Sequence, residues 1–258
     1  MPTLDEIIKA YGQIPELDTF KRPMFIGPHP DDIEFGCGGL ISKLKELNTK
    51  VTYVIMTDGG AGTNDPSITP EMMKEIRHKE SINAASFMGV ENIEFLDLPD
   101  GGNWSKKEAI KKLAPVILKY NPDIIFAPDS RLKTECHSDH IKTGEVVRRL
   151  TQIVPHPESL RRHDINVDGI NQFPQNITLA FYFTDEPNKK VMISENNLNE
   201  KIQSLLLHTS QMQDPSTELL LNYFKLKALK LGEEKGLAED YQVLVPLTQH
   251  VYAEGINY

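Results

Sequence analysis

Two short segments of the sequence concentrate histidines and carboxylates. The first, Gly27 to Asp32, reads GPHPDD, and the second, Glu135 to His140, reads ECHSDH. Together they hold three of the eight histidines of the chain and three aspartates. Both residue types bind metals and transfer protons, so the grouping predicts metal-assisted or acid–base chemistry.

The side chains of the two segments can be divided between a metal and a reaction. Three of them would leave a fourth metal position open, as in a catalytic zinc site: His29, Asp32 and His140. Hydrolysis also needs a base for the attacking water, a group near the oxyanion and an orienting group. The remaining three residues are the candidates for these roles: Asp31, His137 and Asp139.

Simpler interpretations compete with this one. Asp32 could cap the helix that follows it. A single histidine is usually structural, and the sequence scatters the other five without evident partners: His78, His156, His163, His208 and His250. Chance clustering of six such residues in two short segments is nevertheless much the weaker explanation. The cysteines near the two segments, Cys37 and Cys136, are not needed for this site.

The elements that position these residues follow from hydrophobic periodicity, in which apolar runs alternate with helical stretches. The pattern predicts strands at residues 23–28, 51–56, 93–98 and 123–127 and helices at residues 39–47, 71–88, 106–120 and 141–153. Such alternation is typical of a Rossmann-like, doubly wound α/β fold, with a mostly parallel sheet and helices on both faces. The two segments follow the first and fourth strands, where such sheets bind ligands.

The remaining sequence predicts additions to the same domain. Residues 154–175 lack periodicity and are expected to run over the surface. Strands are expected at residues 177–183, 191–194 and 241–247, helices at residues 198–208 and 216–234, and a short amphipathic helix at the N-terminus. We expect one domain over residues 1–258, with its core at about 20–153. Residues 154–258 would then supply edge strands, helices and the rim of the active site.

Composition narrows the class of protein. The net charge of −9 and the pI of about 5.4 argue against a nucleic-acid surface. The sequence has no apolar run of the ~20 residues that span a bilayer. The acidic N-terminus does not read as a secretory signal, and two cysteines do not make a disulfide framework. These features predict a cytoplasmic protein without a membrane span.

At this point the motifs identify a family. GPHPDDIEFGCGG resembles the opening of the LmbE-like, or PIG-L-like, N-deacetylases, and TDG, RHKE, LPDG and HSDH follow in the family's order. The similarity covers residues 23–149 and continues more weakly through HTSQ and AEDY. MTDGGAGTND, FAPDSRLKTECHSDH and LAFYFTDEPN are most similar to the archaeal diacetylchitobiose deacetylases. HPDD combined with HxDH is specific, whereas TDG alone is weak.

The resemblance implies a reaction and roles for the residues. One zinc ion per subunit would be bound by His29, Asp32 and His140, and an acetyl group would be hydrolysed from an N-acetylglucosamine-containing sugar. Asp31 would deprotonate the zinc-bound water. His137, oriented by Asp139, would stabilise the oxyanion and protonate the departing amine.

The resemblance also implies contacts to the substrate. Arg77 and Asp100 match positions that bind sugar hydroxyls or the amino group, although Arg77 could instead be a surface arginine paired with Glu75 or Glu80. His250 matches a histidine that reaches a neighbouring subunit's site, which implies a homo-oligomer, a trimer or hexamer. Where some relatives have a tyrosine, this chain has Glu135, so a tyrosine-assisted oxyanion role is not expected.

The sequence is also compatible with other functions. Within the family, the substrate could be a glucosaminyl-malate conjugate of a thiol-cofactor pathway. A hydrolase of the metallo-β-lactamase type is disfavoured by the strand–helix alternation and the early HPDD. A non-catalytic zinc-binding, sugar-binding protein would need a closed site of four ligands, which Asp31 beside three ligands does not suggest.

Overall fold

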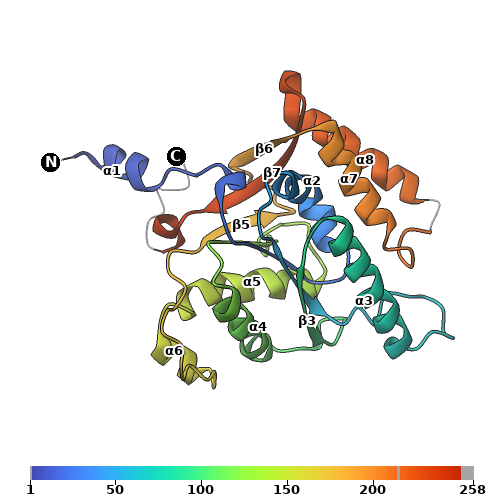
Figure 1. Cartoon of the computed structure of the whole chain (residues 1–258), viewed down its shortest axis with the longest axis horizontal. Helices are drawn as coiled ribbons and strands as arrows, with labels where there is room; N and C mark the ends of the chain where they lie inside the picture. Colours follow the sequence, from blue (N-terminus) through green and yellow to red (C-terminus); the bar gives the residue numbers. More distant parts are fainter. Residues whose placement is uncertain (1, 214–215, 251–258) are drawn as a thin grey trace.

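The computed structural model describes residues 2–213 and 216–250, and these residues build one mixed sheet of seven strands (Figure 1). The strand order is β3-β2-β1-β4-β5-β7-β6. The strands β1 to β5 pair in parallel, and β7 is antiparallel to both of its neighbours. Their bounds are β1 Pro23–Gly27, β2 Thr52–Thr57, β3 Asn92–Leu98, β4 Ile124–Pro128, β5 Thr178–Tyr182, β6 Lys189–Ile193 and β7 Leu237–Leu244.

Helices cover both faces of the sheet, which confirms the predicted doubly wound α/β class. The α-helices are α1 Leu4–Tyr11, α2 Asp32–Glu46, α3 Pro70–Phe87, α4 Lys106–Tyr120, α5 Ser138–Ile153, α6 Pro157–Arg162, α7 Glu195–Leu206 and α8 Ser216–Gly232. Short 3-10 helices are η1 Leu17–Thr19, η2 Glu233–Lys235 and η3 Pro246–Gln249. Buried residues of α2, α3, α7 and α8 belong to one apolar cluster, and those of α4, α5 and α6 belong to the other.

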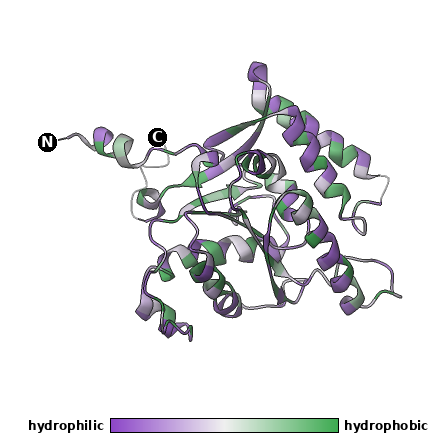
Figure 2. Cartoon of the chain, in the orientation of Figure 1, coloured by the Kyte–Doolittle hydropathy of each residue, from purple (hydrophilic) through white to green (hydrophobic). Residues whose placement is uncertain are grey.

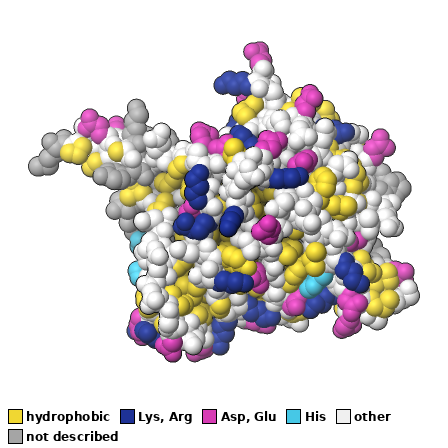
Figure 3. All heavy atoms as spheres, in the orientation of Figure 1, with side chains coloured by type: hydrophobic (Ala, Val, Ile, Leu, Met, Phe, Trp, Pro, Cys, Tyr) yellow, Lys and Arg dark blue, Asp and Glu magenta, His cyan; other side chains and the backbone are white. Residues whose placement is uncertain are grey.

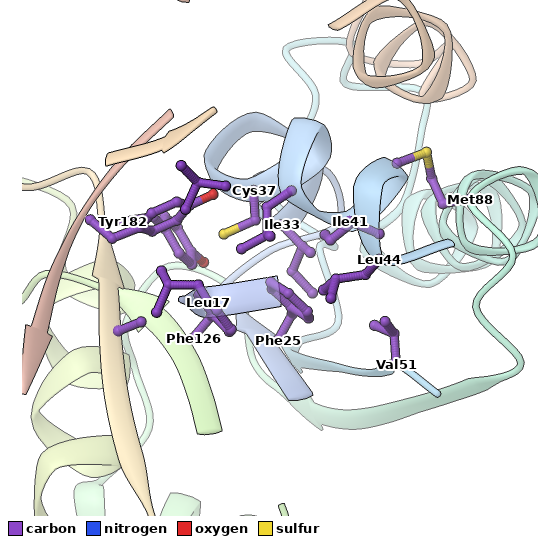
Figure 4. Packing of buried hydrophobic residues seen from close by; sticks show 14 of the residues in the cluster. Leu17, Phe25, Ile33, Cys37, Ile41, Leu44, Val51, Met88, Phe126 and Tyr182 are labelled. Carbon is purple, nitrogen blue, oxygen red and sulfur yellow. The ribbon is translucent and has the colours of Figure 1, made fainter. Parts of the chain in front are cut away.

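The alternation of side chains along β1 shows how the sheet separates the two clusters. Phe25 points to the α2 side, whereas Met24 and Ile26 point to the α4–α5 side. On the α2 side the ring of Phe25 stacks on Phe126 of β4 at 4.3 Å, beneath the buried side chains of α2 (Figure 4). Because β1 is buried on both faces, it reads as a continuous apolar run in the sequence.

The strand order reverses at β1, which pairs with β2 on one side and β4 on the other. In doubly wound sheets the crevice between the carboxyl ends of two such strands is the usual ligand site. The GPHPDD segment joins β1 to α2, and the ECHSDH segment, after β4, spans the start of α5. The topology therefore brings both segments to this crevice.

Helix α2 begins at Asp32, seven residues earlier than the predicted start at Gly39. The prediction was wrong because glycines lower the helix propensity of residues 36–39. In the folded protein, close packing of α2 against its neighbours requires these glycines. A Cβ on Gly36 would lie 2.3 Å from the Tyr182 ring of β5, and one on Gly38 would lie 2.7 Å from Lys201 of α7.

Other boundaries also differ from the prediction, among them the start of α7 at Glu195 instead of Leu198. Helix α5 begins at Ser138 instead of Ile141, because His137 acts as its N-cap. Strand β7 begins at Leu237 instead of Tyr241. Residues 154–175 do not run wholly over the surface. They contain α6, and Leu160, Ile165 and Val167 are buried in the apolar cluster that also holds the buried residues of α4 and α5.

The surface is mixed in character. The helices show alternating hydrophilic and hydrophobic bands (Figure 2), and on the face seen in Figure 3 basic and acidic side chains are interspersed. Within the described residues, none of the helices combines the length and the apolar character that crossing a bilayer requires.

Candidate active site

The GPHPDD segment turns sharply between β1 and α2. His29 to Asp32 are buried, and Asp31 has a φ of 98°, a backbone conformation that few non-glycine residues adopt. The backbone N–H of His29 donates to Asp32 Oδ2 at 2.9 Å, which closes the turn. The strained conformation therefore directs Asp31 and Asp32 from neighbouring positions into one crevice.

The three predicted metal ligands, His29, Asp32 and His140, meet at the carboxylate of Asp32. Asp32 Oδ2 lies 3.0 Å from His29 Nδ1 and 3.3 Å from His140 Nε2. Burial alone would raise the pKa of Asp32, but His140 and His29 outweigh it and hold that pKa well below its usual range. Asp32 therefore offers an ionised carboxylate to a cation.

The geometry of these atoms fits a bound metal. Bonds of about 2.0–2.2 Å around a tetrahedral ion place its ligand atoms about 3.3–3.6 Å apart. The two separations of 3.0 and 3.3 Å are close to that value. Nitrogen atoms of His29, His137 and His140 lie within 4.8 Å of one another, as do ligand atoms of His29, Asp100, His137 and Asp139, so His137 is near enough to join a ligand set.

The far side of the His29 ring is held by carboxylates. His29 Nε2 lies 3.2 Å from Asp139 Oδ2 and 3.2 Å from Asp100 Oδ1. Burial lowers the pKa of His29, but its hydrogen bonds to Asp100, Asp139 and Asp32 raise that pKa well above the usual value. A carboxylate on the far nitrogen fixes the ring and leaves Nδ1 facing Asp32, the arrangement found around metal-bound histidines.

Asp139 does not orient His137 in the way the resemblance implies. Its carboxylate contacts His29 and accepts the backbone N–H of Gly101 at 3.0 Å. Only the backbone N–H of Asp139 reaches His137, donating to Nδ1 at 3.3 Å. The cause is local, because His137 is the N-cap of α5 and its ring takes the capping position.

His137 itself is exposed at the crevice. Burial and the neighbouring His29 and His140 lower its pKa below the usual value. With Nδ1 accepting a hydrogen bond, the neutral ring carries its proton on Nε2. The imidazole can therefore donate a hydrogen bond from Nε2.

Asp31 lies beside the ligand set without contacting the two histidines that face Asp32. Burial raises the pKa of Asp31 to about 7, and Arg77 opposes that shift. Arg77 Nη2 is 3.4 Å from Asp31 Oδ2 and donates to the carbonyl of Pro30 at 2.6 Å. A carboxyl group with a pKa near neutrality is suited to accepting and returning a proton.

Arg77 is buried, with 4% of its surface exposed, so the alternative of a surface arginine is wrong. Its guanidinium also donates to the carbonyl of Gly59 and lies 3.9 Å from Asp100 Oδ2. Asp100 in turn accepts the backbone N–H of Ala61. Burial raises the pKa of Asp100, but its hydrogen bond to His29 and charges nearby lower it overall. In this structure both residues contact other site residues.

His250 is not brought to this crevice. It is exposed at the end of η3, where the preceding Gln249 donates to the carbonyls of Ile177 and Leu244. The two carbonyls lie at the amino end of β5 and at the carboxyl end of the antiparallel β7. This is the end of the sheet opposite the crevice, which lies at the carboxyl ends of the parallel strands. A role for His250 in the same subunit's site is therefore excluded by its position.

The expectation that the remaining histidines lack partners was wrong for two of them. The ring of His78 stacks on Phe95 at 3.9 Å, and Asp97 is 3.2 Å away. His208 is fully buried, with Nε2 3.6 Å from Glu34 Oε2. The contact lies behind Asp31, whose pKa the charge of His208 lowers.

The HTSQ motif was visible in the sequence, but its structural role, which is to hold α3 and the loop after β2, was not predicted. Glu80 accepts hydrogen bonds from Thr209 Oγ1 and from the backbone and hydroxyl of Ser210 at 2.6–2.8 Å. Gln211 Nε2 donates to the carbonyl of Gly62, in the loop after β2. The HTSQ segment thus ties α3 and this loop together, and its polar composition after a helix was the available signal.

Comparison with known proteins agrees with this geometry. Residues 24–151 match the family described as PIG-L, GlcNAc-PI de-N-acetylase. A diacetylchitobiose deacetylase of Thermococcus kodakarensis is 32% identical over 239 residues, covering 92% of this chain and 83% of the relative. A probable N-acetyl-alpha-D-glucosaminyl L-malate deacetylase 2 of Bacillus anthracis is 28% identical over 217 residues, covering 79% of this chain and 87% of the relative.

A solved structure shows the same similarity in three dimensions. The N,N'-diacetylchitobiose deacetylase of Pyrococcus horikoshii, solved with its inhibitor MPG, superposes with a TM-score of 0.84 at 31% identity. The match covers 96% of this chain and 92% of that one. The fold is therefore shared over nearly the whole length.

Proposed function

Because the chain belongs to the PIG-L family of de-N-acetylases, we propose that it hydrolyses the acetamide of an N-acetylglucosamine-containing sugar, with a chitooligosaccharide as the first candidate substrate. The observation that carries this proposal is the position of Asp31. A buried carboxylate lies beside three side chains that could bind a metal, His29, Asp32 and His140, without contacting the two histidines. A hydrolase needs such a base, and a site that only binds metal does not.

We propose His29, Asp32 and His140 as the ligands of one zinc ion. The alternative set that replaces Asp32 by His137 is less suitable, because the capping bond occupies Nδ1 of His137. When bound, a divalent metal supplies Lewis acidity, which polarises an amide carbonyl and lowers the pKa of a water molecule.

The residues of the chain then divide the proton transfers. Asp31 accepts the proton of the attacking water and, as a carboxylic acid, can return it to the departing amine. His137 donates from Nε2 to the oxyanion of the tetrahedral intermediate. Asp139 and Asp100 hold the His29 ring, and Arg77 holds Asp31 and the Pro30 carbonyl in place. Contacts of Arg77 and Asp100 with the sugar remain a proposal.

The alternative substrate inside the family is a glucosaminyl-malate conjugate, as printed for the Bacillus anthracis relative. Chitooligosaccharide is favoured because the Thermococcus kodakarensis relative is more similar over more of the chain. An acetate-release assay on N-acetylglucosamine, diacetylchitobiose and glucosaminyl-malate substrates tests the choice. We expect the highest kcat/KM on diacetylchitobiose. Activity confined to the malate conjugate would overturn it.

The structure does not test three of the predictions, and they stay proposals. They are a single domain, a cytoplasmic location and a homo-oligomer that is a trimer or hexamer. The distance of His250 from the crevice of its own subunit is compatible with a role in a neighbouring one. If so, His250→Ala should lower kcat/KM without loss of bound zinc. An unchanged rate in the assembled protein would remove His250 from the site.

A further inference from the structure

Glu135 contacts both histidines of the ECHSDH segment. Its Oε1 accepts the backbone N–H of His137 at 2.7 Å, and its Oε2 lies 3.1 Å from His140 Nδ1. The side chains of Glu135 and His140 are largely covered, with 16% and 14% of their surfaces exposed. The backbone N–H of Glu135 donates to the carbonyl of Leu132, so a turn fixes the position of the residue.

The two nitrogens of His140 face different partners. Nε2 is directed at Asp32, 3.3 Å away, on the side of the proposed ligand set. Nδ1 is buried and forms no hydrogen bond of regular geometry with the described residues. Among these residues, Glu135 is the carboxylate within ion-pair distance of Nδ1. A small rotation of either side chain would align an N–H on Nδ1 with Oε2.

The same arrangement already exists at His29. There Nδ1 faces Asp32, while Nε2 lies 3.2 Å from the carboxylates of Asp139 and Asp100. A carboxylate on the far nitrogen of a metal-bound histidine fixes the tautomer and the ring orientation and makes the ligand nitrogen more basic. The geometry thus repeats one device at two imidazoles, using carboxylates from different segments of the chain.

We propose that Glu135 is a positioning residue for the metal site. It keeps the proton of His140 on Nδ1, so that Nε2 presents its lone pair beside Asp32, and through the His137 N–H it fixes the first turn of α5. The inference rests on the proposed function, because it presumes a metal at His29, Asp32 and His140. It adds a residue to that site and a reason for a carboxylate at this position.

A direct role of Glu135 in the oxyanion hole is chemically unsuitable. An ionised carboxylate has no proton to donate, and its charge would repel a developing oxyanion. The glutamate therefore fits contact with the imidazole and the backbone N–H better than contact with the reacting carbonyl.

The test is zinc affinity, measured by competition with a chromophoric chelator in the absence of substrate. Glu135→Gln keeps an oxygen for the His137 N–H but loses the carboxylate at His140 Nδ1, and Glu135→Ala loses both. We expect both variants to bind zinc about 10–100-fold more weakly than the wild type, the range for lost partners of metal-bound histidines. Glu158→Gln, at an exposed carboxylate on α6, is the matched control and should bind as the wild type does.

Thermal unfolding of the metal-free proteins separates positioning from folding. The proposal predicts that metal-free Glu135→Gln melts as the wild type does while its zinc affinity falls. Wild-type zinc affinity in Glu135→Gln would overturn the inference and leave the proposed function intact. So would an affinity loss matched by unfolding of the metal-free variant. A wild-type protein that binds no zinc would overturn both.

Discussion

The two corners that meet at the crevice differ in how deeply they are buried. The β1–α2 corner, residues 27–32, is buried throughout, whereas in the β4–α5 corner His137 is exposed and His140 is partly exposed. The first corner is fixed by contacts of Asp32 with the His29 backbone and of Arg77 with the Pro30 carbonyl. The second is held by the His137 N-cap, by Glu135 and by the Asp139 carboxylate, which contacts His29 and the Gly101 N–H.

This difference suggests a division of labour between the corners. The buried corner would hold the proposed base and two of the proposed metal ligands in a low-dielectric setting, where charge interactions are strong and misplacement is costly. The more exposed corner would supply the third proposed ligand and the proposed N–H donor. Substitutions in the first corner should therefore affect folding as well as chemistry, and those in the second should affect metal binding or chemistry alone.

The largest effect is expected from His140→Ala, which removes a ligand from the exposed corner. The variant should fold, lose bound zinc and lose nearly all zinc-dependent activity, because two ligands hold the ion far less tightly than three. Elemental analysis after dialysis checks the metal content, and His156→Ala, at an exposed histidine just before α6, is the control. Wild-type zinc content in His140→Ala would refute the ligand set.

Asp31→Asn removes the proposed base from the buried corner while conserving its volume. We expect zinc to be retained and kcat to fall by about 10²–10⁴-fold, the usual range for a lost general base. Acetate release together with elemental analysis measures both quantities, and Asp168→Asn at an exposed loop position is the control. Full activity in Asp31→Asn would remove Asp31 as the base.

His137→Gln tests the exposed corner without touching the proposed ligands. We expect zinc to stay bound, the melting temperature to change little and kcat to fall by about 10²–10³-fold, as for a lost oxyanion donor. The comparison with His140→Ala is decisive. If His137→Gln loses zinc as His140→Ala does, the histidine belongs to the ligand set instead.

Gly36→Ala probes the support of the buried corner. A Cβ there would lie 2.3 Å from the ring of Tyr182, whose hydroxyl donates to the carbonyl of Ile26 in β1. Overpacking of this kind costs about 1–3 kcal/mol of unfolding free energy. Chemical denaturation should show the loss, with Asn83→Ala on the exposed face of α3 as the control. Unchanged stability would mean that α2 can move away from β5 at little cost.

The chemistry was readable from the sequence because residue type and spacing carry it. His29, Asp31 and Asp32 follow an apolar run at the expected edge of the sheet, and His137 and His140 follow another. The start of α2 was not readable, because residues 36–39 contain three glycines whose need lies in the packing of β5, α7 and β7. Local propensity cannot register the contact of Gly36 with Tyr182, 146 positions further along the chain.

The electrostatic partners were also beyond the sequence. The sequence also allowed Arg77 to be a surface helix residue, and its burial against Pro30 and Gly59 comes from the way α3 packs on the loops. Asp139 read as the partner of His137, yet the turn of α5 directs its carboxylate to His29. His208 lies 174 positions from Glu34, so only the folded chain could pair them.

The most direct test of the whole account is acetate release from diacetylchitobiose by the metal-free protein before and after one equivalent of zinc is added. The account predicts no release above background before addition. After addition it predicts acetate and free amine in equal amounts from the wild type, and almost none from zinc-loaded Asp31→Asn. Equal activity with and without zinc, or full activity in zinc-loaded Asp31→Asn, would contradict it.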